Sequence, residues 1–576
     1  MTKKLLTLIV AAVSLLPAAF AQGRGRGGAA AADPPREEGI PVTDQLVISR
    51  CGTCHPRDAK GDMTRISWER TTPEGWEEAI KRMVRLNGLT ITPEDARSIV
   101  KYLASSHGLA PEEAKPVMYI PEHRMIDETI IPNNTVHDAC ANCHAFGRPM
   151  SWRRSKEDWQ YLANMHTFLY PQADNIFRRG SGAFGRRQTG ADHGPEPVQV
   201  ALDYLAKAAP LHTPEWAAWS ARMRPAKLAG RWLVSAYLPG HGLYCGEMEL
   251  KAGSGEDEFT TSIKLKSVKN GSLLSRTGSG VVYAGYSWRG RSDAATKPGN
   301  SPDDLSHEMR EALWFDPNQN SAQGRWFWGE YQEFGFDVKL VRASADPTLL
   351  GTDVTLLKEG SSGSRVRLIG DNFPAHMAPA DLDFGAGVTV TRVVPSSPTE
   401  IVAEVSVAPD AVTGKRDVSV KRSVLESGIA VYDHIDYIKV TPEAALAHLG
   451  SDVHPKGFQQ FDAIAYNRGA DGKSHTADDV ELGPIDVTWS VEEFQSVFGD
   501  DDKGFVGHLS PSGLFTPASD GPNPERKFSR NNYGNVWVVA TSKTEKEKDG
   551  RPMTGKAYLV VAVPTYIKWD QPEVEK

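Results

Sequence analysis

Apolar residues recur at helical spacing through the first part of the chain, up to about Pro214. A helix is predicted to begin at Thr72-Pro73-Glu74, which offers an N-cap, a proline at the first helical position and an early acidic residue. It is predicted to end at Asn87-Gly88. A second helix is predicted to begin at Thr92-Pro93-Glu94-Asp95, and a third to close the region near Leu205. The apolar faces are Trp76, Ile80, Met83 and Val84, then Ala96, Ile99, Val100 and Leu103, then Val198, Ala201, Leu202 and Leu205.

Beyond Pro214 the helical periodicity fades, and apolar and polar residues alternate in short runs between glycine-rich turns. Such alternation predicts strands that bury one face. The predicted strands are 230–237, 260–266, 281–288 and 324–331, then 364–369, 387–393, 399–407 and 415–419, and finally 458–466, 487–490, 535–541 and 556–563. The first group suggests an antiparallel barrel or sandwich, and the second an immunoglobulin-like sandwich of short strands.

A chain of 576 residues is too long for one hydrophobic core, so several domains are expected. The predicted fold class is multidomain α plus all-β: a mainly helical N-terminal domain, then about three antiparallel β barrel or sandwich (Ig-like) domains. The predicted domains are the helical domain 42–213, a β-barrel domain 214–345, an Ig-like sandwich 346–440 and a C-terminal β-domain 441–576. Two N-terminal segments, 1–21 and 22–41, precede them.

The first 21 residues have the pattern of a signal peptide. Lys3 and Lys4 are followed by an apolar run from Leu5 to Leu16 and by Ala19-Phe20-Ala21, a cleavage site of the small-x-small type. The run is too short for a comfortable membrane span, and no later stretch approaches one. The alternative is that the segment is retained as a membrane anchor. Segment 22–41 is rich in Gly, Arg, Ala and Pro without apolar periodicity, which predicts a disordered leader. The mature protein is therefore expected in the periplasm, with no membrane span.

Charge and motif content exclude several classes of function. A net charge of -8 lacks the basic footprint that nucleic-acid binding requires. The strand-rich part contains no GxSxG, no HExxH and no phosphate-binding loop, so no catalytic machinery of these kinds is expected there. The chemistry of the chain is expected in its helical part.

Two five-residue motifs carry that chemistry: Cys51-Gly-Thr-Cys54-His55 and Cys140-Ala-Asn-Cys143-His144. CxxCH is the attachment motif of c-type haem, in which both thiols bind the porphyrin edge and the histidine is the proximal iron ligand. Zinc sites and redox-active thiol pairs also use CxxC, but neither explains a histidine directly after both pairs. Four of the five cysteines lie in these motifs, so two covalently bound haem c groups are predicted.

The sequences after the two motifs repeat each other. Trp68 and Trp76 follow the first motif, Trp152 and Trp159 follow the second, and both copies close with Tyr-Leu-Ala, at 102–104 and 204–206. Such self-similarity predicts two stacked copies of one helical unit with a cytochrome c pattern. Seven residues after the second tryptophan, Met83 occupies one copy and His166 the other. Both side chains can ligate haem iron, so these two are the predicted sixth ligands.

Other side chains compete for those two positions. Met63 is an alternative ligand for the first haem, Met150 and Met165 are alternatives for the second, and Met83 can also be a core residue on an apolar stripe. His137 can also be a ligand, although its place before the second motif favours a surface or supporting role. The remaining histidines of the region are expected to be exposed: His107, His123, His193 and His212.

The two predicted ligand sets imply different reduction potentials. A thioether ligand favours ferrous iron and raises the potential relative to imidazole. The haem held by His144 and His166 is therefore predicted to have the lower potential. We expect electrons to run from it to the haem held by His55 and Met83.

Two further features are assigned simpler roles. Cys245 has no spare thiol to pair with and is predicted to be a buried small hydrophobic residue. Asp471, Asp478, Asp479 and Glu481 form an acidic loop, but the loop lacks the twelve-residue spacing of a helix–loop–helix calcium site. A solvated turn between strands is favoured there over a calcium site.

An export signal, two CxxCH units and a long β-rich remainder together resemble the α subunit of quinohaemoprotein amine dehydrogenase. The resemblance rests on Cys51 to His55, Cys140 to His144, the tryptophan spacing to Met83 and His166, and the segments that open β-domains at Trp232 and Gly370-Asp-Asn-Phe373. It covers nearly the whole mature chain. The haem motifs alone occur in many cytochromes, so the combination with the β-domains carries the family assignment.

This resemblance implies a periplasmic heterotrimer that oxidises primary amines to aldehydes and ammonia. The substrate-oxidising quinone, cysteine tryptophylquinone, would lie in a small partner subunit, and a β-propeller subunit would complete the assembly. The present chain would be the haem subunit of this oxidoreductase, passing electrons from the quinone to a soluble blue-copper protein or cytochrome c. No catalytic residue is therefore expected in the chain itself.

Two other classes of function compete with this interpretation. A generic periplasmic dihaem electron-transfer protein would use its β-domains to bind a surface or an unrelated dehydrogenase. A dihaem cytochrome c peroxidase would be an enzyme in its own right, would need an open or displaceable iron site, and would not need the long β-rich remainder.

Overall fold

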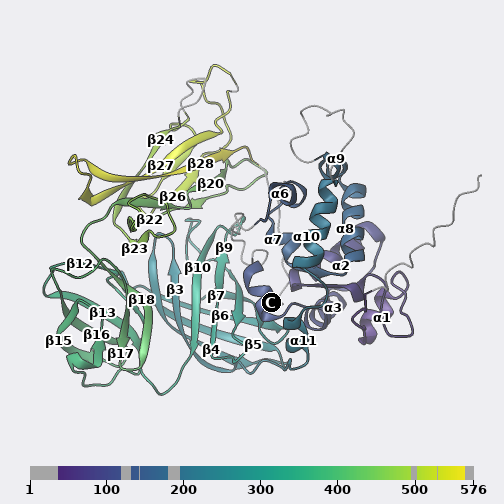
Figure 1. Ribbon diagram of the computed structural model, residues 1–576, viewed down its shortest axis with the longest axis horizontal. Helices are drawn as coiled ribbons and strands as arrows, with labels where there is room; N and C mark the ends of the chain where they lie inside the picture. The colour runs from purple at the N-terminus through teal and green to yellow at the C-terminus, as the bar shows by residue number, and fades with distance from the viewer. Residues whose placement is uncertain are drawn as a thin grey trace, which may run out of the picture. The chain divides into compact units, whose positions relative to one another are not determined.

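The computed structural model describes residues 37–118, 131–141, 143–179, 195–494, 502–528 and 530–564. Residues from Gly39 onwards form one compact unit. Helices come first along the chain and antiparallel β-domains follow, so the predicted fold class is confirmed (Figure 1). Among the described residues, no helix is long and apolar enough to cross a membrane. The predicted signal peptide, most of the predicted leader, His123 and His193 lie outside the described residues.

The helical part contains two copies of one unit. The helices are α1 (Gln45–Cys51), α2 (Pro73–Asn87), α3 (Pro93–Ser106), α4 (Pro111–Ala114), α6 (Asn134–Cys140), α7 (Gly147–Met150), α8 (Lys156–Leu169), α9 (Pro171–Arg179), α10 (Pro197–Ala208) and α11 (Pro214–Ser220). The predicted caps of the helix from Thr72 to Gly88 are confirmed, because the Thr72 side chain accepts from Gly75 N and Gly88 ends α2 with a left-handed backbone, φ 72°. The predicted start of α3 is also confirmed, with Thr92 accepting from Asp95 N.

A short antiparallel ladder joins the two copies. Strand β1 (Glu69–Thr71) pairs with β2 (Trp152–Arg154), with Arg70 opposite Arg153. These strands lead directly into α2 and α8, so the ladder sets how the two helices lie relative to each other. Arg70 is fully buried, and its guanidinium binds the Glu113 carboxylate at 2.8 and 3.0 Å. Charged groups are stable in a protein interior only when they are paired and hydrogen-bonded, as these two are.

The first β-domain is a closed antiparallel barrel of eight strands in meander order. The strands are β3 (Gly230–Leu238), β4 (Gly242–Ala252), β5 (Glu258–Ser267), β6 (Leu273–Tyr283), β7 (Ser287–Ala294), β8 (Met309–Phe315), β9 (Ser321–Trp328) and β10 (Phe334–Arg342). Its interior is filled by large buried rings that include Trp232, Trp288 and Trp326. The predicted strand 281–288 is wrong, because it spans the end of β6, a turn and the start of β7. Gly285, at φ 77°, lies in that turn.

The second β-domain is a sandwich of two four-stranded sheets, in the orders β11-β13-β16-β15 and β12-β18-β17-β14. The strands are β11 (Thr348–Thr352), β12 (Leu356–Lys358), β13 (Ser364–Asp371), β14 (Leu382–Asp383), β15 (Val388–Ser397), β16 (Glu400–Val407), β17 (Gly414–Val420) and β18 (Ser423–Tyr432). In β16 every second residue is buried, and Val366, Ile401 and Val418 from the two sheets meet in one core.

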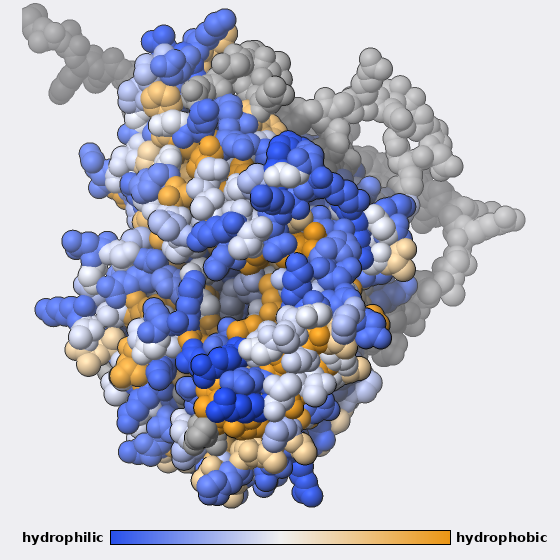
Figure 2. All heavy atoms as spheres, turned by 90° about the vertical axis from the view of Figure 1, so that its left-hand side faces the viewer, coloured by the Kyte–Doolittle hydropathy of each residue, from blue (hydrophilic) through white to orange (hydrophobic). Residues whose placement is uncertain are grey.

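The last β-domain contains sheets β19-β22-β23, β20-β28-β27-β24 and β21-β26-β25. The strands are β19 (Tyr437–Thr441), β20 (Ala444–His448), β21 (Gln459–Gln460), β22 (Asp462–Asn467), β23 (Val480–Pro484), β24 (Val487–Glu493), β25 (Gly507–Leu509), β26 (Leu514–Pro517), β27 (Gly534–Lys546) and β28 (Pro552–Ala562). They share one core around Phe461 and Phe515. On the face shown in Figure 2, hydrophilic residues predominate and hydrophobic ones lie among them in small groups.

The barrel contacts the other three domains through specific polar contacts. Arg289 in β7 pairs with Glu74 of α2, and Arg231 in β3 donates to both carboxylate oxygens of Asp371 at 2.9 and 2.8 Å. Tyr237, also in β3, donates to Asp462 of the last domain at 2.8 Å. The barrel therefore anchors both the helical domain and the two later β-domains.

Candidate functional site

Two equivalent seven-residue helices carry the first cysteine of each CxxCH motif. Helix α1 ends at Cys51 and α6 ends at Cys140. Each begins with the same cap, because Asp44 accepts from Val47 N and Asn133 accepts from Val136 N, both at 2.9 Å. The short helix therefore fixes the first thiol, while the following thiol, Cys54 or Cys143, is exposed at the surface.

The motif histidines are oriented through one ring nitrogen. His55 Nδ1 lies 2.8 Å from Thr64 O, and His144 Nδ1 lies 3.1 Å from Ala145 O. A carbonyl acceptor at Nδ1 fixes the tautomer that leaves Nε2 as the lone-pair donor, which is the arrangement of histidines that ligate metals. Neither Nε2 atom forms a hydrogen bond within the described part of the chain. Both residues therefore fit the role of proximal haem ligand.

His166 shows the same arrangement on the opposite helix. Its Nδ1 lies 2.8 Å from Leu162 O, one turn back along α8. Burial lowers the pKa of His166 and of His144, and for His144 the nearby charges of Arg148 and His166 lower it further. A lowered pKa favours the neutral imidazole, which is the form that binds metals, so both residues would be suited to hold one haem iron.

The two candidate methionine ligands of the first haem differ in burial and in their contacts. Met83 is half-buried in the second half of α2, where its sulfur lies 3.5 Å from Asn87 Nδ2. Met63 is completely buried, in an apolar cluster with Val42 and Val47 against which Cys51 packs. It directly precedes Thr64, whose carbonyl holds the His55 ring.

Around the second motif the alternatives are engaged elsewhere or exposed. The Met165 sulfur lies 3.2 Å from Arg82 Nη1. Met150 is half-buried and packs against two apolar clusters, one of them that of Trp152 and Trp159. His137 is exposed, with Nδ1 3.3 Å from Asp138 Oδ1.

Equivalent tryptophans fix the register of the two copies. Trp76 Nε1 donates to His107 O at 2.9 Å, and Trp159 Nε1 donates to Ala209 O at 3.2 Å. The N-caps also correspond, since Thr72 accepts from Gly75 N and Ser155 accepts from Asp158 N. Met83 and His166 then stand at the same distance from their caps, so the structure places them at equivalent positions of α2 and α8.

The first thiol of each motif does not have the character of a reactive cysteine. Burial raises the pKa of Cys140 to about 12 and also raises the pKa of Cys51, to which the neighbouring Cys54 adds. Catalytic CxxC pairs instead have a lowered thiol pKa at an electropositive site. Among the described residues no group of three or more His, Cys, Asp or Glu side chains is arranged to hold a metal ion by itself.

His107 was predicted to be exposed, and that prediction is wrong. The residue is completely buried at the end of α3, with Nε2 3.0 Å from Ile40 O and Nδ1 2.9 Å from Ser106 Oγ. Its ring packs edge-on against Trp76 at 6.2 Å. His107 therefore holds the segment before α1 against the closing helix of the first copy.

Sequence patterns missed the cluster of charges between α2 and α8. Arg148 pairs with Glu78 at 2.6 Å, Arg65 pairs with Asp158 at 2.7 Å, and Arg154 pairs with Glu69. Arg82 belongs to the same cluster. No local motif predicts this cluster. The one available signal is a charged residue, Arg82, next to the apolar face of α2.

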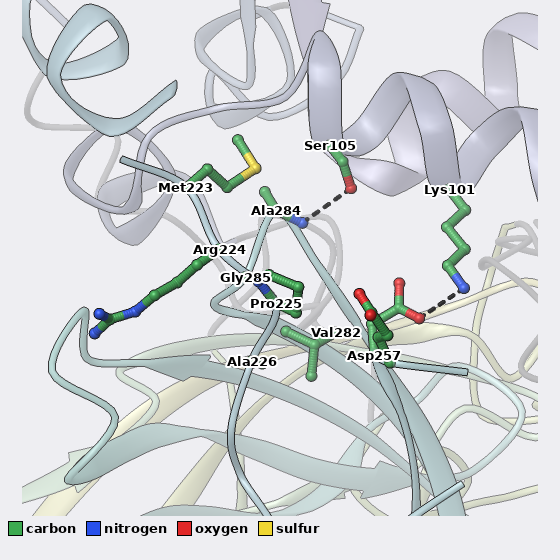
Figure 3. Close-up of a pocket in the computed structure, with 11 residues that line it drawn as sticks. Lys101, Ser105, Met223, Arg224, Pro225, Ala226, Asp257, Val282, Ala284 and Gly285 are labelled. Atoms are coloured by element: carbon green, nitrogen blue, oxygen red, sulfur yellow. Dashed lines mark hydrogen bonds and ion pairs between the residues drawn. The ribbon is translucent and has the colours of Figure 1, made fainter. Parts of the chain in front are cut away.

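A cleft with a defined lining lies away from the predicted ligands. It has a volume of about 450 Å³ and lies between α3 and the β6–β7 turn (Figure 3). Lys101 Nζ pairs with Asp257 at 2.7 Å, and Ser105 Oγ accepts from Ala284 N at 3.2 Å. These contacts join the helical domain to the barrel, and none of the predicted haem ligands lines the cleft.

Cys245 and the acidic loop of the last β-domain contribute to packing and to a turn. Cys245 is buried in a small apolar cluster with Leu233 and Leu350, and burial raises its pKa to about 12. In the acidic loop, Asp479 accepts hydrogen bonds from Tyr437 Oη and Thr476 N, and Asp478 accepts from Asp471 N. These carboxylates hold the turn by binding groups of the chain itself.

Comparisons with solved structures and with curated proteins give no family assignment. Solved structures with some likeness include a redesigned β-barrel (13% identity over 21% of this chain and 98% of that chain, TM-score 0.18) and human protocadherin-24 EC1-2 (13% identity, 38% and 96%, TM-score 0.15). These scores are too low to support a conclusion. A comparison with curated proteins found no match.

Family models match the chain in order along most of its length. The model "Quinohemoprotein amine dehydrogenase A, alpha subunit, haem binding" matches residues 42–180. Models of alpha subunit domains II, III and IV of quinohemoprotein amine dehydrogenase match residues 225–343, 346–433 and 438–574. The first matched segment covers the helical domain through α9, and the other three coincide with the barrel, the sandwich and the last β-domain. The chain belongs to the family of quinohemoprotein amine dehydrogenase alpha subunits.

Proposed function

We propose that the chain is the dihaem electron-transfer subunit of a periplasmic amine dehydrogenase. It receives electrons from a quinone in a partner subunit, where primary amines are oxidised to aldehydes and ammonia. It passes them to a soluble blue-copper protein or cytochrome c. The observation that carries the proposal is the pair of equivalent units, each with a CxxCH motif on a capped helix and one ligand-type side chain at the same position of α2 or α8.

In this proposal each unit holds one covalently bound haem c. Cys51 and Cys54 form the thioethers of the first, with His55 and Met83 as iron ligands, and Cys140 and Cys143 form those of the second, with His144 and His166. Haem iron supplies one-electron chemistry when bound. The residues of the chain fix the ligand nitrogens through Nδ1 hydrogen bonds and surround each site with apolar side chains.

The position of Met63 supports Met83 as the sixth iron ligand of the first haem. Thr64 O lies 2.8 Å from Nδ1 of His55, the ring nitrogen that would face away from the iron, and Met63 is the preceding residue in the same loop. A sixth ligand must come from the opposite face, which a helix outside this loop can reach. Met83 lies on such a helix, with an apolar and partly exposed neighbourhood that includes Ile80 and Val84.

Partners in this proposal follow from the family. The assembly is a heterotrimer in which a β-propeller subunit and a small subunit with cysteine tryptophylquinone accompany this chain. The three β-domains provide the extended surface that such partners need, and the barrel ties them to the haem units through the buried Glu74–Arg289 pair. Export to the periplasm is proposed from the signal-peptide pattern of residues 1–21 and because c-type haem is attached after export.

Purification of the native complex tests the proposal. Identifying every subunit by mass and adding a primary amine without oxygen should show three polypeptides and reduction of both haems in the absorption spectrum. A secondary or tertiary amine is the matched control and should leave the haems oxidised. Peroxide turnover by the isolated chain, with no response of the complex to amines, would instead favour a dihaem peroxidase.

A further inference from the structure

Arg82 lies between the two proposed haem sites. It precedes Met83 on α2, and its Nη1 lies 3.2 Å from the sulfur of Met165, which precedes His166 on α8. A thioether is a weak hydrogen-bond acceptor and carries no negative charge. Within the described part of the chain, no carboxylate lies within ion-pair distance of Arg82. The guanidinium is half-buried, and burial lowers its pKa.

The charge cluster around Arg82 has an excess of cations. Four guanidinium groups, those of Arg65, Arg82, Arg148 and Arg154, face three carboxylates, those of Glu69, Glu78 and Asp158. The first, third and fourth arginines each pair with one of these carboxylates. Arg82 is therefore the cation for which this cluster supplies no anion.

A second unsatisfied donor lies close by. Arg154 is 3% exposed, and its Nε is buried without a hydrogen-bond partner. Its guanidinium stacks on the ring of Trp152 at 4.2 Å. Buried guanidinium N–H groups normally have an acceptor, because a buried donor without one loses the hydrogen bonds that it forms in water. A group outside the described chain is therefore expected to supply the acceptor for this N–H.

Both arginines lie at the second haem site. Burial lowers the pKa of His166 most, and the charges of Arg82, Arg148 and Arg154 lower it further. Arg154 also lies over the ring of Trp159, at 5.7 Å. That tryptophan packs in the apolar cluster that contacts Cys140. Arg82, Arg154 and the apolar cluster that contacts Cys140 therefore all adjoin the space between α2 and α8.

We propose that Arg82, supported by Arg154, binds a propionate carboxylate of the haem attached at Cys140 and Cys143. This inference rests on the proposed function, since it requires a haem at that site. A haem carries two carboxylates, and a planar guanidinium binds a carboxylate through two parallel hydrogen bonds. Arg82 is then a positioning residue that also sets the reduction potential of the second haem.

The pairing has two measurable consequences. A cation next to the haem favours the ferrous state, so Arg82 raises the potential of the second haem and narrows the gap to the first. The ion pair also keeps the propionate ionised in both oxidation states. This propionate therefore adds no pH dependence to the potential of the second haem around neutrality as long as Arg82 is present.

The experiment uses the complete holoprotein and the variants Arg82→Ala and Arg82→Lys. Arg85→Ala is the control, because Arg85 is exposed in the last turn of the same helix. Redox titration from pH 6 to pH 9 should show a lower potential of the second haem in Arg82→Ala, together with a new decrease of that potential as pH rises. Arg82→Lys should show a smaller shift, and Arg85→Ala none.

A crystal structure of the holoprotein gives an independent readout. It should place Arg82 within hydrogen-bond distance of a propionate of the second haem. Arg82 remaining on Met165, unchanged potentials in Arg82→Ala, or a shift confined to the first haem would overturn the inference. Failure of the proposed function is distinguishable, because it would show as the absence of a second haem, or of a bis-imidazole spectrum, in the unmodified protein.

Discussion

Glu74 and Arg289 form a buried ion pair that joins α2 to the barrel, with Arg289 Nε 2.5 Å from Glu74 Oε1 and side chains that are 1% and 5% exposed. Removing either partner leaves an uncompensated buried charge, which costs on the order of 3–5 kcal/mol. We expect Glu74→Leu and Arg289→Met each to lower the free energy of unfolding by about this amount.

The double variant should lose less than either single one, because no buried charge remains. Urea unfolding followed by the fluorescence of the barrel tryptophans measures the effect, with Lys556→Met of the exposed Lys556–Glu492 pair as control. Losses that simply add in the double variant would show that the two side chains are not coupled.

His107 should make stability fall in mildly acidic solution. Burial, the largest cause, lowers its pKa from 6.5 to about 4 in the folded chain. As pH decreases from about 6.5 to 4, the unfolded chain takes up a proton that the folded chain cannot, so the free energy of unfolding decreases across this window.

The variant His107→Gln should lack this part of the pH dependence, and His212→Gln, at an exposed position, should retain it. Denaturant unfolding at several pH values provides the comparison. A pH dependence that is identical in His107→Gln and the unmodified chain would contradict the buried, neutral state of this imidazole.

Met83→Leu should change the first haem and Met63→Leu should not. Loss of the thioether removes the sulfur-to-iron charge-transfer band of the oxidised protein. It also lowers the potential of that haem by a fraction of the roughly 0.8 V range that axial ligands span. Both residues are apolar and replaced by the same side chain, so the pair is a matched comparison. The opposite result would make Met63 the ligand.

The haem attached at Cys140 and Cys143 should have the lower potential of the two. His166→Met should raise it toward that of the first haem, because a thioether stabilises ferrous iron relative to imidazole. Spectroelectrochemical titration of the unmodified protein and of this variant measures both. A higher potential for the second haem in the unmodified protein would reverse the expected direction of electron flow.

Local signals in the sequence predicted local structure well. The caps Thr72, Thr92 and Gly88 stand where they were expected, because a cap depends on neighbouring residues alone. The repeat comparison likewise predicted the equivalence of Met83 and His166. Predictions failed where distant contacts decide, as at His107, which is buried by Ile40 and Trp76.

Long-range pairing explains the other omissions. Arg289 and Glu74 are 215 positions apart, and Arg82 and Met165 are 83 apart, so no motif joins them. In the barrel, the apolar run through Val282 and Tyr283 continues past Gly285 to Trp288, which hides the turn between β6 and β7. Only the closure of the barrel shows that the run contributes to two strands.

Covalent attachment of two haems is the central claim, and the mass of the exported, denatured protein tests it most directly. The account predicts a mass equal to the polypeptide without its signal peptide plus two haem groups, with the absorption of c-type haem retained after denaturation. It also predicts loss of one haem in Cys140→Ala/Cys143→Ala and retention of both in Cys245→Ala. A colourless protein with the mass of its amino acids alone would contradict it.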